Sequence, residues 1–288
     1  MKILLLGQHG QVSQELQRSL CGANQLTVLG RNQLDLAKPE LIRQHVKQLR
    51  PELIINAAAH TAVDQAESEP EQAFAINATA PGMLAEVAAE LGTPLIHYST
   101  DYVFDGNQAD PYRENDATHP LSVYGRSKLA GEQAIQAAGG MHLILRTSWV
   151  YSQHGRNFLL TMQRLLQERD ALDIVDDQVG APTWAGSIAH TTAQLIEQWR
   201  SGQAGPWGVY HLTALGQTSW FGFASAIAAH LHSQGKRVAT LHPIPSSAYP
   251  TPAQRPLNSR LDCSRLQQDW RVQLPDWQAA LTECLSRS

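Results

Sequence analysis

The sequence has few cysteines, no long apolar run and little net charge, and each shortage excludes a class of protein. The three cysteines, Cys21, Cys263 and Cys284, show no paired spacing, which is typical of a reducing compartment and not of a disulfide scaffold. No stretch approaches the about 20 apolar residues that span a bilayer, and the run at 3–6 is too short for a signal peptide core. A net charge of −4 over 288 residues gives no reason to expect nucleic acid or an anionic membrane as partner. We therefore expect a cytoplasmic globular protein.

The first 150 residues alternate short apolar runs with amphipathic helical patterns. We predict strands at 2–6, 26–29, 53–56, 95–98 and 142–146, with helices ending near 22, at 39–49, at 71–91 and beginning near 124. This alternation predicts an α/β protein with a doubly wound parallel sheet of the Rossmann type.

Beyond residue 151 the alternation loosens. Helices are predicted near 158–166, 184–199, 218–231 and 276–285, and strands near 173–176 and 208–212. We predict a dinucleotide-binding domain over 1–150, rejoined by the helix near 184–200, and a smaller C-terminal α/β substrate-binding domain over 151–288. The proline-rich segment 246–259 is either a linker or a rigid lid over a ligand.

A glycine loop follows the first predicted strand and leads into a helix. Gly7, Gly10, Gln11 and Val12 form a turn in which the backbone can approach a pyrophosphate at a helix N-terminus. The position of the usual third glycine is occupied by Ser13. Taken alone, the loop fits a dinucleotide site and an ordinary strand–helix turn equally well.

The end of the second predicted strand lacks the acidic residue that would bind a ribose 2′-hydroxyl. Arg31 stands there instead, and a guanidinium pairs well with a 2′-phosphate, which favours NADPH while NADH stays possible. The alternative is a solvated loop arginine. Further along, Asp35, followed by Leu36, either reaches the adenine or caps the next helix.

The third predicted strand ends in small residues against which a cofactor can lie. Ala59 closes this strip, and His60 and Thr61 follow it. His60 has no partner at the spacing of metal ligands, so we expect hydrogen bonding or simple exposure and no metal site.

Tyr124 and Lys128 are four residues apart, so on a helix they share one face about 6 Å apart along the axis. An adjacent ammonium lowers the pKa of a phenol, which can then donate a proton to a carbonyl oxygen. Thr100, at the end of the preceding predicted strand, could hydrogen-bond the same oxygen. The alternative is a surface tyrosine with a surface lysine one turn later.

Several motifs are spread over nearly the whole chain. They are Gly7-x-x-Gly10-Gln11-Val12, residues 56–64, residues 99–106, Tyr124-Gly125-x-x-Lys128, residues 146–151, residues 177–183 and Arg255-Pro256-x-Asn258-Ser259. As a set they resemble the dTDP-4-dehydrorhamnose reductase family of extended short-chain dehydrogenases/reductases. The resemblance implies reduction of the 4-keto group of dTDP-4-dehydro-L-rhamnose by NAD(P)H to dTDP-L-rhamnose, a precursor of surface polysaccharide such as lipopolysaccharide O-antigen.

The resemblance also implies roles for single residues. It implies Tyr124 as proton donor, Lys128 as the group that tunes its pKa and binds the nicotinamide ribose, and Thr100 as a hydrogen-bond donor to the carbonyl. By the same resemblance, other residues line the cofactor (Tyr98, His60, Thr61), meet the substrate (Asp101, Tyr102, Trp149) or help to close over it (Arg255, Asn258). From the residues alone, Tyr102 and Trp149 would be interpreted as core aromatics.

Some members of this family bridge two subunits through a metal held by glutamates. Glu15 fits one such position, but Gly186 stands where another is expected. We therefore expect no metal-bridged dimer and leave monomer and homodimer open.

Two other functions compete with the reductase hypothesis. The first is an epimerase or dehydratase of nucleotide sugars that retains NAD, which Arg31 in place of an acid disfavours. The second is a non-catalytic regulatory subunit that binds NADP, which would have no need of Thr100, Tyr124 and Lys128.

Overall fold

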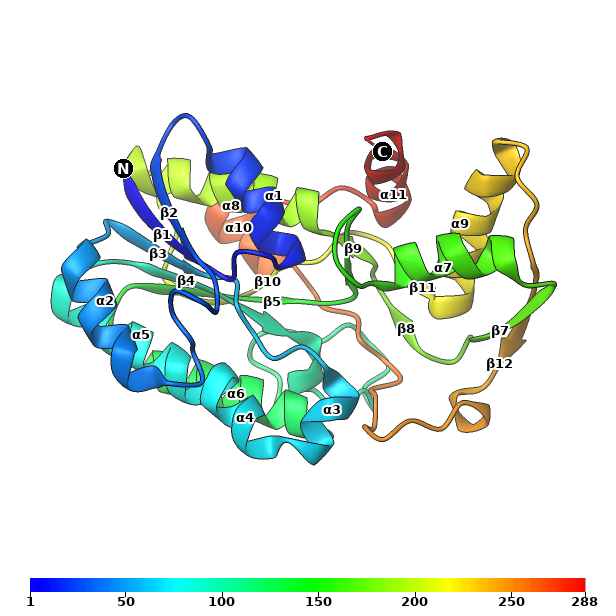
Figure 1. Cartoon of the computed structure of the whole chain (residues 1–288), viewed down its shortest axis with the longest axis horizontal. Helices are drawn as coiled ribbons and strands as arrows, with labels where there is room; N and C mark the ends of the chain where they lie inside the picture. The colour runs from blue at the N-terminus through cyan, green and yellow to red at the C-terminus, as the bar shows by residue number, and fades with distance from the viewer. Residues whose placement is uncertain (288) are drawn as a thin grey trace.

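The short apolar runs form strands, and those at the centre of the sheet are buried on both faces, as parallel strands covered by helices must be. They are β1 (Lys2–Leu6), β2 (Gln25–Leu29), β3 (Leu53–Asn56), β4 (Leu95–Thr100), β5 (His142–Thr147) and β10 (Gly208–His211). In this computed structural model, which describes residues 1–287, they form one parallel sheet in the order β10-β5-β4-β3-β1-β2 (Figure 1). The predicted doubly wound α/β class is confirmed.

Helices cover both faces of this sheet (Figure 1). One face carries α1 (Gln11–Leu20), α8 (Ala185–Arg200) and α10 (Ser264–Trp270), and the other carries α2 (Ile42–Leu49), α5 (Ala80–Leu91) and α6 (Val123–Ala137). Alternate residues of each strand point to opposite faces. In β1, Ile3 and Leu5 therefore join the first core, while Leu4 and Leu6 join the second.

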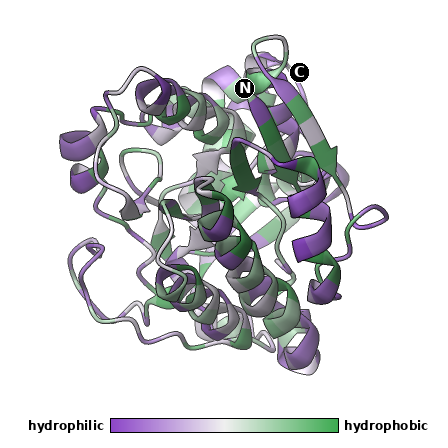
Figure 2. Cartoon of the chain, turned by 90° about the vertical axis from the view of Figure 1, so that its left-hand side faces the viewer, coloured by the Kyte–Doolittle hydropathy of each residue, from purple (hydrophilic) through white to green (hydrophobic). Residues whose placement is uncertain are grey.

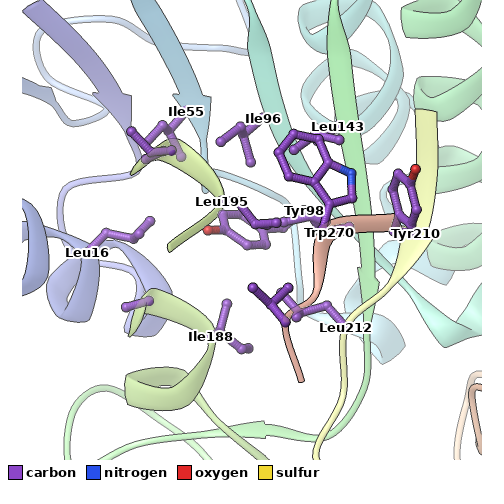
Figure 3. Close-up of a cluster of buried hydrophobic side chains, with 14 of the residues drawn as sticks. Leu16, Ile55, Ile96, Tyr98, Leu143, Ile188, Leu195, Tyr210, Leu212 and Trp270 are labelled. Carbon is purple, nitrogen blue, oxygen red and sulfur yellow. The ribbon is translucent and has the colours of Figure 1, made fainter. Parts of the chain in front are cut away.

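The first core is closed by segments that are far apart in the sequence. Figure 3 shows Leu16 of α1, Ile188 of α8 and Trp270 of α10 converging on residues of the central strands. Hydropathy colouring shows the same arrangement, with apolar strands inside and polar helix surfaces outside (Figure 2). Burial of these side chains supplies the main favourable term for folding.

A smaller lobe lies beyond β5, at the right of Figure 1. Three two-stranded pairs build it: β7 (Ala171–Val175) with β12 (Thr240–Ile244), β8 (Val179–Gly180) with β11 (Thr218–Ser219), and β6 (Val150–Tyr151) with β9 (Thr183–Trp184). Helices α7 (Phe158–Glu168), α9 (Trp220–Ser233) and α11 (Trp277–Ser286) share a separate apolar core with these strands. Of these strands only β7 was predicted from the sequence, and β6, β8, β9, β11 and β12 were not.

The predicted division of the chain at residue 150 stays a prediction, but the structure shows which later segments lie against the large sheet. Helix α8, expected to return, packs against α1. Strand β10 also returns and pairs with β5, and α10 packs against β10.

The helix predicted over 71–91 needs a correction. It is composed of α4 (Pro70–Phe74), a π-helical turn η2 (Ala75–Thr79) and α5, and it is preceded by the unpredicted α3 (Val63–Ser68). Such π turns are frequent at functional sites. The turn carries Asn77, whose side chain forms hydrogen bonds with the main chain of His60 and the hydroxyl of Ser127. Asn77 thus makes a structural polar contact.

Short 3₁₀ turns complete the chain: η1 (Pro39–Leu41), which begins the predicted helix at 39, η3 (Asp101–Val103) and η4 (Ser246–Ala248). Across residues 1–287, the helices are all too short or too polar to cross a bilayer.

Candidate active site

A pocket of about 720 Å³ opens at the carboxyl ends of β1, β3 and β4, where the strand order changes direction. Open α/β sheets bind ligands at this kind of crevice. Every residue predicted to bind the cofactor lines it: Gly7, Gly10, Gln11, Val12, Arg31, Asp35, Leu36, Ala59, His60, Thr61, Tyr98, Tyr124 and Lys128. The structure thus brings these residues together, while their individual roles stay predictions.

The glycine loop is shaped for close contact between two strand ends. Gly7 has φ +101°, and a Cβ there would lie 2.9 Å from the backbone of Ala57 and Ala58. Gly10 begins α1 without a side-chain cap, and the first turn has no acidic residue. The backbone N–H groups of this turn are therefore available to an anion in the pocket.

Around Arg31 the pocket is open to solvent. The Arg31 side chain is 69% exposed, and its Nε lies 3.6 Å from Oδ1 of Asp35. The same oxygen accepts a hydrogen bond from the Ala37 amide (3.1 Å), and no side chain caps η1. Asp35 thus closes a local turn instead of capping the helix, and Leu36 is buried in the second core.

Two polar atoms at the pocket have no partner within residues 1–287. The His60 main chain is fixed by Asn77, which accepts from its N–H (2.8 Å) and donates to its carbonyl (3.0 Å). The Nδ1 atom of His60 and the hydroxyl of Thr147 are buried without a hydrogen bond, and both residues line the pocket. Buried polar groups normally have partners, so this pair fits a polar ligand such as a dinucleotide.

Tyr98 contributes differently from what the sequence suggests. Its ring belongs to the first core, and its hydroxyl bonds Thr192 of α8 (2.7 Å). Its carbonyl accepts a hydrogen bond from Lys128 Nζ (2.6 Å). Tyr98 thus holds Lys128 through its backbone carbonyl, and its own contact with the cofactor stays a prediction.

Helix α6 places Tyr124 and Lys128 at the end of β4. Ser122 caps the helix by accepting the Gly125 N–H (3.2 Å). A Cβ on Gly125 would lie 2.2 Å from the carbonyl oxygen of Tyr102, so glycine lets the helix approach the loop after β4. Tyr124 and Lys128 consequently face the same pocket, as their spacing predicts.

The pKa of Tyr124 moves in the direction opposite to the prediction. Burial raises it to about 12, the charge of Asp101 adds to the rise, and a hydrogen bond from Thr100 opposes it. The expected net lowering of this pKa is wrong, because the loss of solvent around the hydroxyl dominates. The phenol is therefore protonated at neutral pH.

Lys128 is almost completely buried, with 1% of its surface exposed. Burial lowers its pKa to about 8, and the charge of Glu132 one turn later opposes this. Besides the Tyr98 carbonyl, Nζ lies 3.1 Å from Nε2 of His97. The amine therefore titrates close to neutral pH.

The residues expected to meet the substrate begin beside Tyr124. The Thr100 hydroxyl bonds Asp101 Oδ1 (3.0 Å), and burial raises the pKa of Asp101 to about 6. The ring of Tyr102 lies edge-on to Tyr124, with centroids 5.4 Å apart, and its hydroxyl is hydrogen-bonded to Arg255.

Arg255 lies in a strap, residues 246–259, that returns from the smaller lobe. Its guanidinium pairs with the carboxylate of Asp64 in α3 (2.7 and 3.0 Å). The proline-rich segment is therefore anchored at the Rossmann side and is not a free linker. This supports the lid alternative, with Arg255 beside Tyr102.

Trp149 and Asn258 lie outside the cofactor pocket. Trp149 adopts φ +49° and stacks on Trp220 of the smaller lobe at 3.7 Å, while remaining half-buried. The Asn258 amide donates to the carbonyls of Gln108 and Asp110 and accepts from Arg260. Because these bonds engage its side chain, the structure shows Asn258 as a clamp on the strap and does not bring it to the ligand pocket.

Some residues of the site escaped sequence reasoning. Gly155 and Arg156 line the pocket from the side of the smaller lobe, and Thr147 lines it from the end of β5. His97 of β4 contacts the Lys128 amine within the core. Alternation along β4 places His97 on the face opposite Tyr98, towards α6, which is a signal that could have identified it.

Comparison with known proteins shows the family to which the chain belongs. The whole sequence, residues 1–288, matches the family described as RmlD substrate binding domain. The dTDP-4-dehydrorhamnose reductases of Burkholderia thailandensis and Escherichia coli K12 are each 47% identical to it over 292 residues, with 99% of this chain and 98% and 97% of those proteins covered. The chain belongs to this family of dTDP-4-dehydrorhamnose reductases.

Solved structures of the family agree with the fold. The Bacillus anthracis dTDP-4-dehydrorhamnose reductase, whose crystal structure contains NADP, superposes with a TM-score of 0.92 at 32% identity over 100% of both chains. The UDP-glucose 4-epimerase of Thermus thermophilus shares the fold at 17% identity, with a TM-score of 0.77 over 99% of both chains.

The side chain of Glu15, which fits a metal-binding position of some family members, is buried. Its carboxylate lies 3.1 Å from Arg18 and 3.6 Å from His154, while Gly186 packs on the ring of Trp184. Among residues 1–287, His, Cys, Asp and Glu side chains form no group of three that could hold a metal. The absence of a metal-bridged dimer stays a prediction.

Proposed function

We propose that this protein reduces the 4-keto group of dTDP-4-dehydro-L-rhamnose with NADPH to give dTDP-L-rhamnose. The observation that carries the proposal is that α6 brings Tyr124 and Lys128 to one pocket, with Thr100 hydrogen-bonded to the Tyr124 hydroxyl. The nicotinamide would supply the hydride. The chain's own residues would bind the cofactor, orient the sugar and deliver the proton.

Tyr124 is the proposed proton donor to the substrate oxygen. With a pKa near 12 the phenol keeps its proton until the carbonyl oxygen gains negative charge, and it then becomes the nearest acid. The Thr100 hydroxyl, which lies beside the phenol, would turn its single proton from Asp101 Oδ1 to the same oxygen and so donate a second hydrogen bond to it. Lys128 would face the nicotinamide ribose with the N–H that neither Tyr98 nor His97 engages.

The pocket provides groups for each part of a dinucleotide. The open first turn of α1, behind Gly10 and Gln11, would hold the pyrophosphate, and Arg31 would pair with a 2′-phosphate. His60 Nδ1 and Thr147 would hydrogen-bond polar atoms of the cofactor.

On the substrate side, Asp101 and Tyr102 would contact the sugar beside Tyr124, with Arg255 completing the enclosure through the strap. Trp149 would supply an apolar face at the boundary between the lobes, supported by its stacking on Trp220. Asn258 would act by fixing the strap.

The test is turnover of purified protein with dTDP-4-dehydro-L-rhamnose and NADPH, followed by loss of NADPH absorbance and identification of the dTDP-sugar product. Removal of a general acid typically costs about 10²–10⁴ in rate, so Tyr124→Phe should lose that much kcat while binding NADPH normally. Ser201→Ala, which removes an exposed hydroxyl just after α8 and away from the pocket, is the control and should behave as the wild type. Unchanged kcat in Tyr124→Phe would remove this residue from the mechanism.

The same preparation tests the two competing functions. Nicotinamide absorbance retained through purification would favour an epimerase or dehydratase. Failure to oxidise NADPH with any keto-sugar nucleotide, together with normal NADPH binding, would favour a regulatory subunit.

A further inference from the structure

Arg156 is a cation of the cofactor pocket to which the proposed reduction assigns no role. It lies in the turn 152–157, between β6 and α7, and its exposed side chain lines the pocket. Within residues 1–287 it forms no hydrogen bond or ion pair. The other lysine and arginine side chains of the pocket have protein partners, since Arg31 lies 3.6 Å from a carboxylate and Lys128 donates to a carbonyl at 2.6 Å. The whole guanidinium of Arg156 is therefore available to a ligand.

Gln11, the first residue of α1, fastens this turn to the start of the helix. Its Oε1 atom accepts hydrogen bonds from the Ser152 hydroxyl (3.0 Å) and the Asn157 amide (2.8 Å). Between them, Gly155 adopts φ +73°, and a Cβ there would lie 3.5 Å from the Gln11 side chain. Both chain neighbours of Arg156 thus lie against Gln11, and the arginine is held beside the N-terminus of α1.

The order of the strands places this N-terminus in the middle of the pocket. β4 and β2 lie on opposite sides of the neighbouring strands β3 and β1, so Tyr124 and Lys128 stand at one end of the pocket and Arg31 at the other. The glycine turn and α1 follow β1, between these ends. A dinucleotide with its nicotinamide at Tyr124 and its adenosine at Arg31 has its pyrophosphate at the N-terminus of α1.

Buried polar atoms outside the helix also indicate a ligand in this pocket. Thr147 is 7% exposed and the His60 side chain 9%, and the Thr147 hydroxyl and His60 Nδ1 have no partner within residues 1–287. Both residues line the pocket, as Arg156 does. The first turn of α1 has neither an acidic residue nor a side-chain cap, so its N–H groups are available to an anion. These groups and the unpaired guanidinium are complementary to one phosphate-bearing ligand.

We infer that Arg156 binds the pyrophosphate of NADPH. A guanidinium presents N–H groups in a planar fork that matches two oxygens of a phosphate. Because Arg156 comes from the side of the smaller lobe, the cofactor on the Rossmann side is bound by both parts of the protein. The inference rests on the cofactor part of the proposed function and deepens it, but its tests measure binding and need no sugar.

The first test compares the binding of NADPH and NADH to the wild type and to Arg156→Met by calorimetric titration. Both cofactors carry the pyrophosphate, so the Kd of each should rise by the same factor, about fivefold for the loss of an exposed charge-assisted contact. Unchanged Kd values would overturn the inference. A rise for NADPH alone would assign Arg156 to the 2′-phosphate and would overturn it as well.

The matched control is Arg169→Met. Arg169 is an exposed arginine at the other end of α7, outside the pocket, and within residues 1–287 its side chain likewise has no partner. Its loss removes the same charge from the same lobe and should leave both Kd values unchanged. An equal rise in the two variants would show that the net charge governs binding, against a contact at Arg156.

Two further measurements separate a charge on the pyrophosphate from a structural role of Arg156. Arg156→Lys keeps the charge and should recover most of the affinity. The Kd of NADPH should also depend less steeply on salt in Arg156→Met than in the wild type. A lysine variant that binds as weakly as the methionine variant, or an unchanged salt dependence, would contradict the contact. Far-UV circular dichroism checks that each variant is folded.

Adenosine 2′-monophosphate locates the contact within the cofactor. This probe has no pyrophosphate, so Arg156→Met should leave its Kd unchanged, whereas Arg31→Ala, at the other end of the pocket, should raise it. A weaker affinity for this probe in Arg156→Met would place Arg156 at the adenosine and overturn the inference. Wild-type protein that binds no NADPH would overturn the proposed function and the inference together. Normal NADPH binding without turnover would overturn the reductase proposal alone, because none of these titrations contains a sugar.

Discussion

Lys128 of α6 and Arg146 of β5 are two buried cations that differ in how their charge is compensated. Arg146 forms a two-pronged pair with Glu132, with contacts of 2.6 and 3.0 Å, and both side chains are 5% exposed or less. Lys128 has a carbonyl and a histidine as partners, and no carboxylate of residues 1–287 bonds it directly. The pKa of Lys128 is lowered to about 8, as expected for a buried ammonium without an ion-pair partner.

The presence or absence of a carboxylate partner decides whether a buried basic group only supports the fold or can also exchange a proton. A fully paired guanidinium stays charged and contributes to the fold only as long as its partner is present. A buried amine that lacks such a pair titrates near physiological pH, which is typical of groups that take part in proton transfer. Burial is therefore common to both cations, and the partner decides their chemistry.

Arg146→Met should have the largest effect on stability. It leaves the Glu132 carboxylate buried without its partner, and breaking such a pair costs about 3–5 kcal/mol of unfolding free energy. Urea denaturation would measure the loss. Arg164→Met, which breaks the exposed pair with Glu168, is the control and should stay within about 0.5 kcal/mol of the wild type. Equal losses in both variants would show that burial does not separate the two pairs.

Lys128→Met should change how stability depends on pH. The pKa is about 8 in the folded protein and 10.5 for a free lysine, so between these values the unfolded chain holds a proton that the native state has lost. Wild-type stability should therefore rise with pH across this window, and the cost of the buried charge is fully present below it.

Relative to Lys128→Met, the wild type should gain roughly 3 kcal/mol between about pH 7.5 and 10.5. Denaturation series at fixed pH values give the difference directly. Lys47→Met, at an exposed lysine paired with Glu90, should show no such relative slope. Parallel curves for the wild type and Lys128→Met would mean that the amine is not perturbed.

Asp64→Asn tests an ion pair of intermediate burial. The Asp64 and Arg255 side chains are 41% and 23% exposed, so the stability loss should be about 1 kcal/mol or less. Because the strap loses an anchor beside Tyr102, KM for the dTDP-sugar should rise while KM for NADPH stays constant. Asp170→Asn, which breaks the exposed pair with Arg237, should change neither constant.

Arg31→Ala should have the smallest effect on stability, within about 0.5 kcal/mol, because its contact with Asp35 is exposed. Its effect should appear in cofactor choice. Loss of about 1 kcal/mol of pairing with a 2′-phosphate would lower the preference for NADPH over NADH roughly fivefold. The ratio of kcat/KM values measures this, with Arg18→Ala on α1 as control. An unmoved ratio would make Arg31 a bystander.

The cofactor side of the site was predictable because its residues follow strand ends. Gly7, Ala59 and Thr100 each come directly after or at the end of a buried apolar run, and parallel strands place such ends at one edge. The spacing of Tyr124 and Lys128 likewise required only helical geometry. Contacts across the lobes were not predictable in this way, since Arg255 reaches Asp64 and Trp149 reaches Trp220 only after the smaller lobe has packed.

The sequence by itself determined the parallel sheet, the glycine turn and the shared face of Tyr124 and Lys128, because periodicity and chain direction are local properties. Tertiary structure alone decided the return of β10 and α10 to the sheet, the π turn at Asn77 and the protonation of the site. A pKa depends on how much water and which partners surround a group, and those are set by segments far away in the chain. For this reason the pKa of Tyr124 shifts in the direction opposite to the prediction, although Tyr124 and Lys128 face the same pocket as predicted.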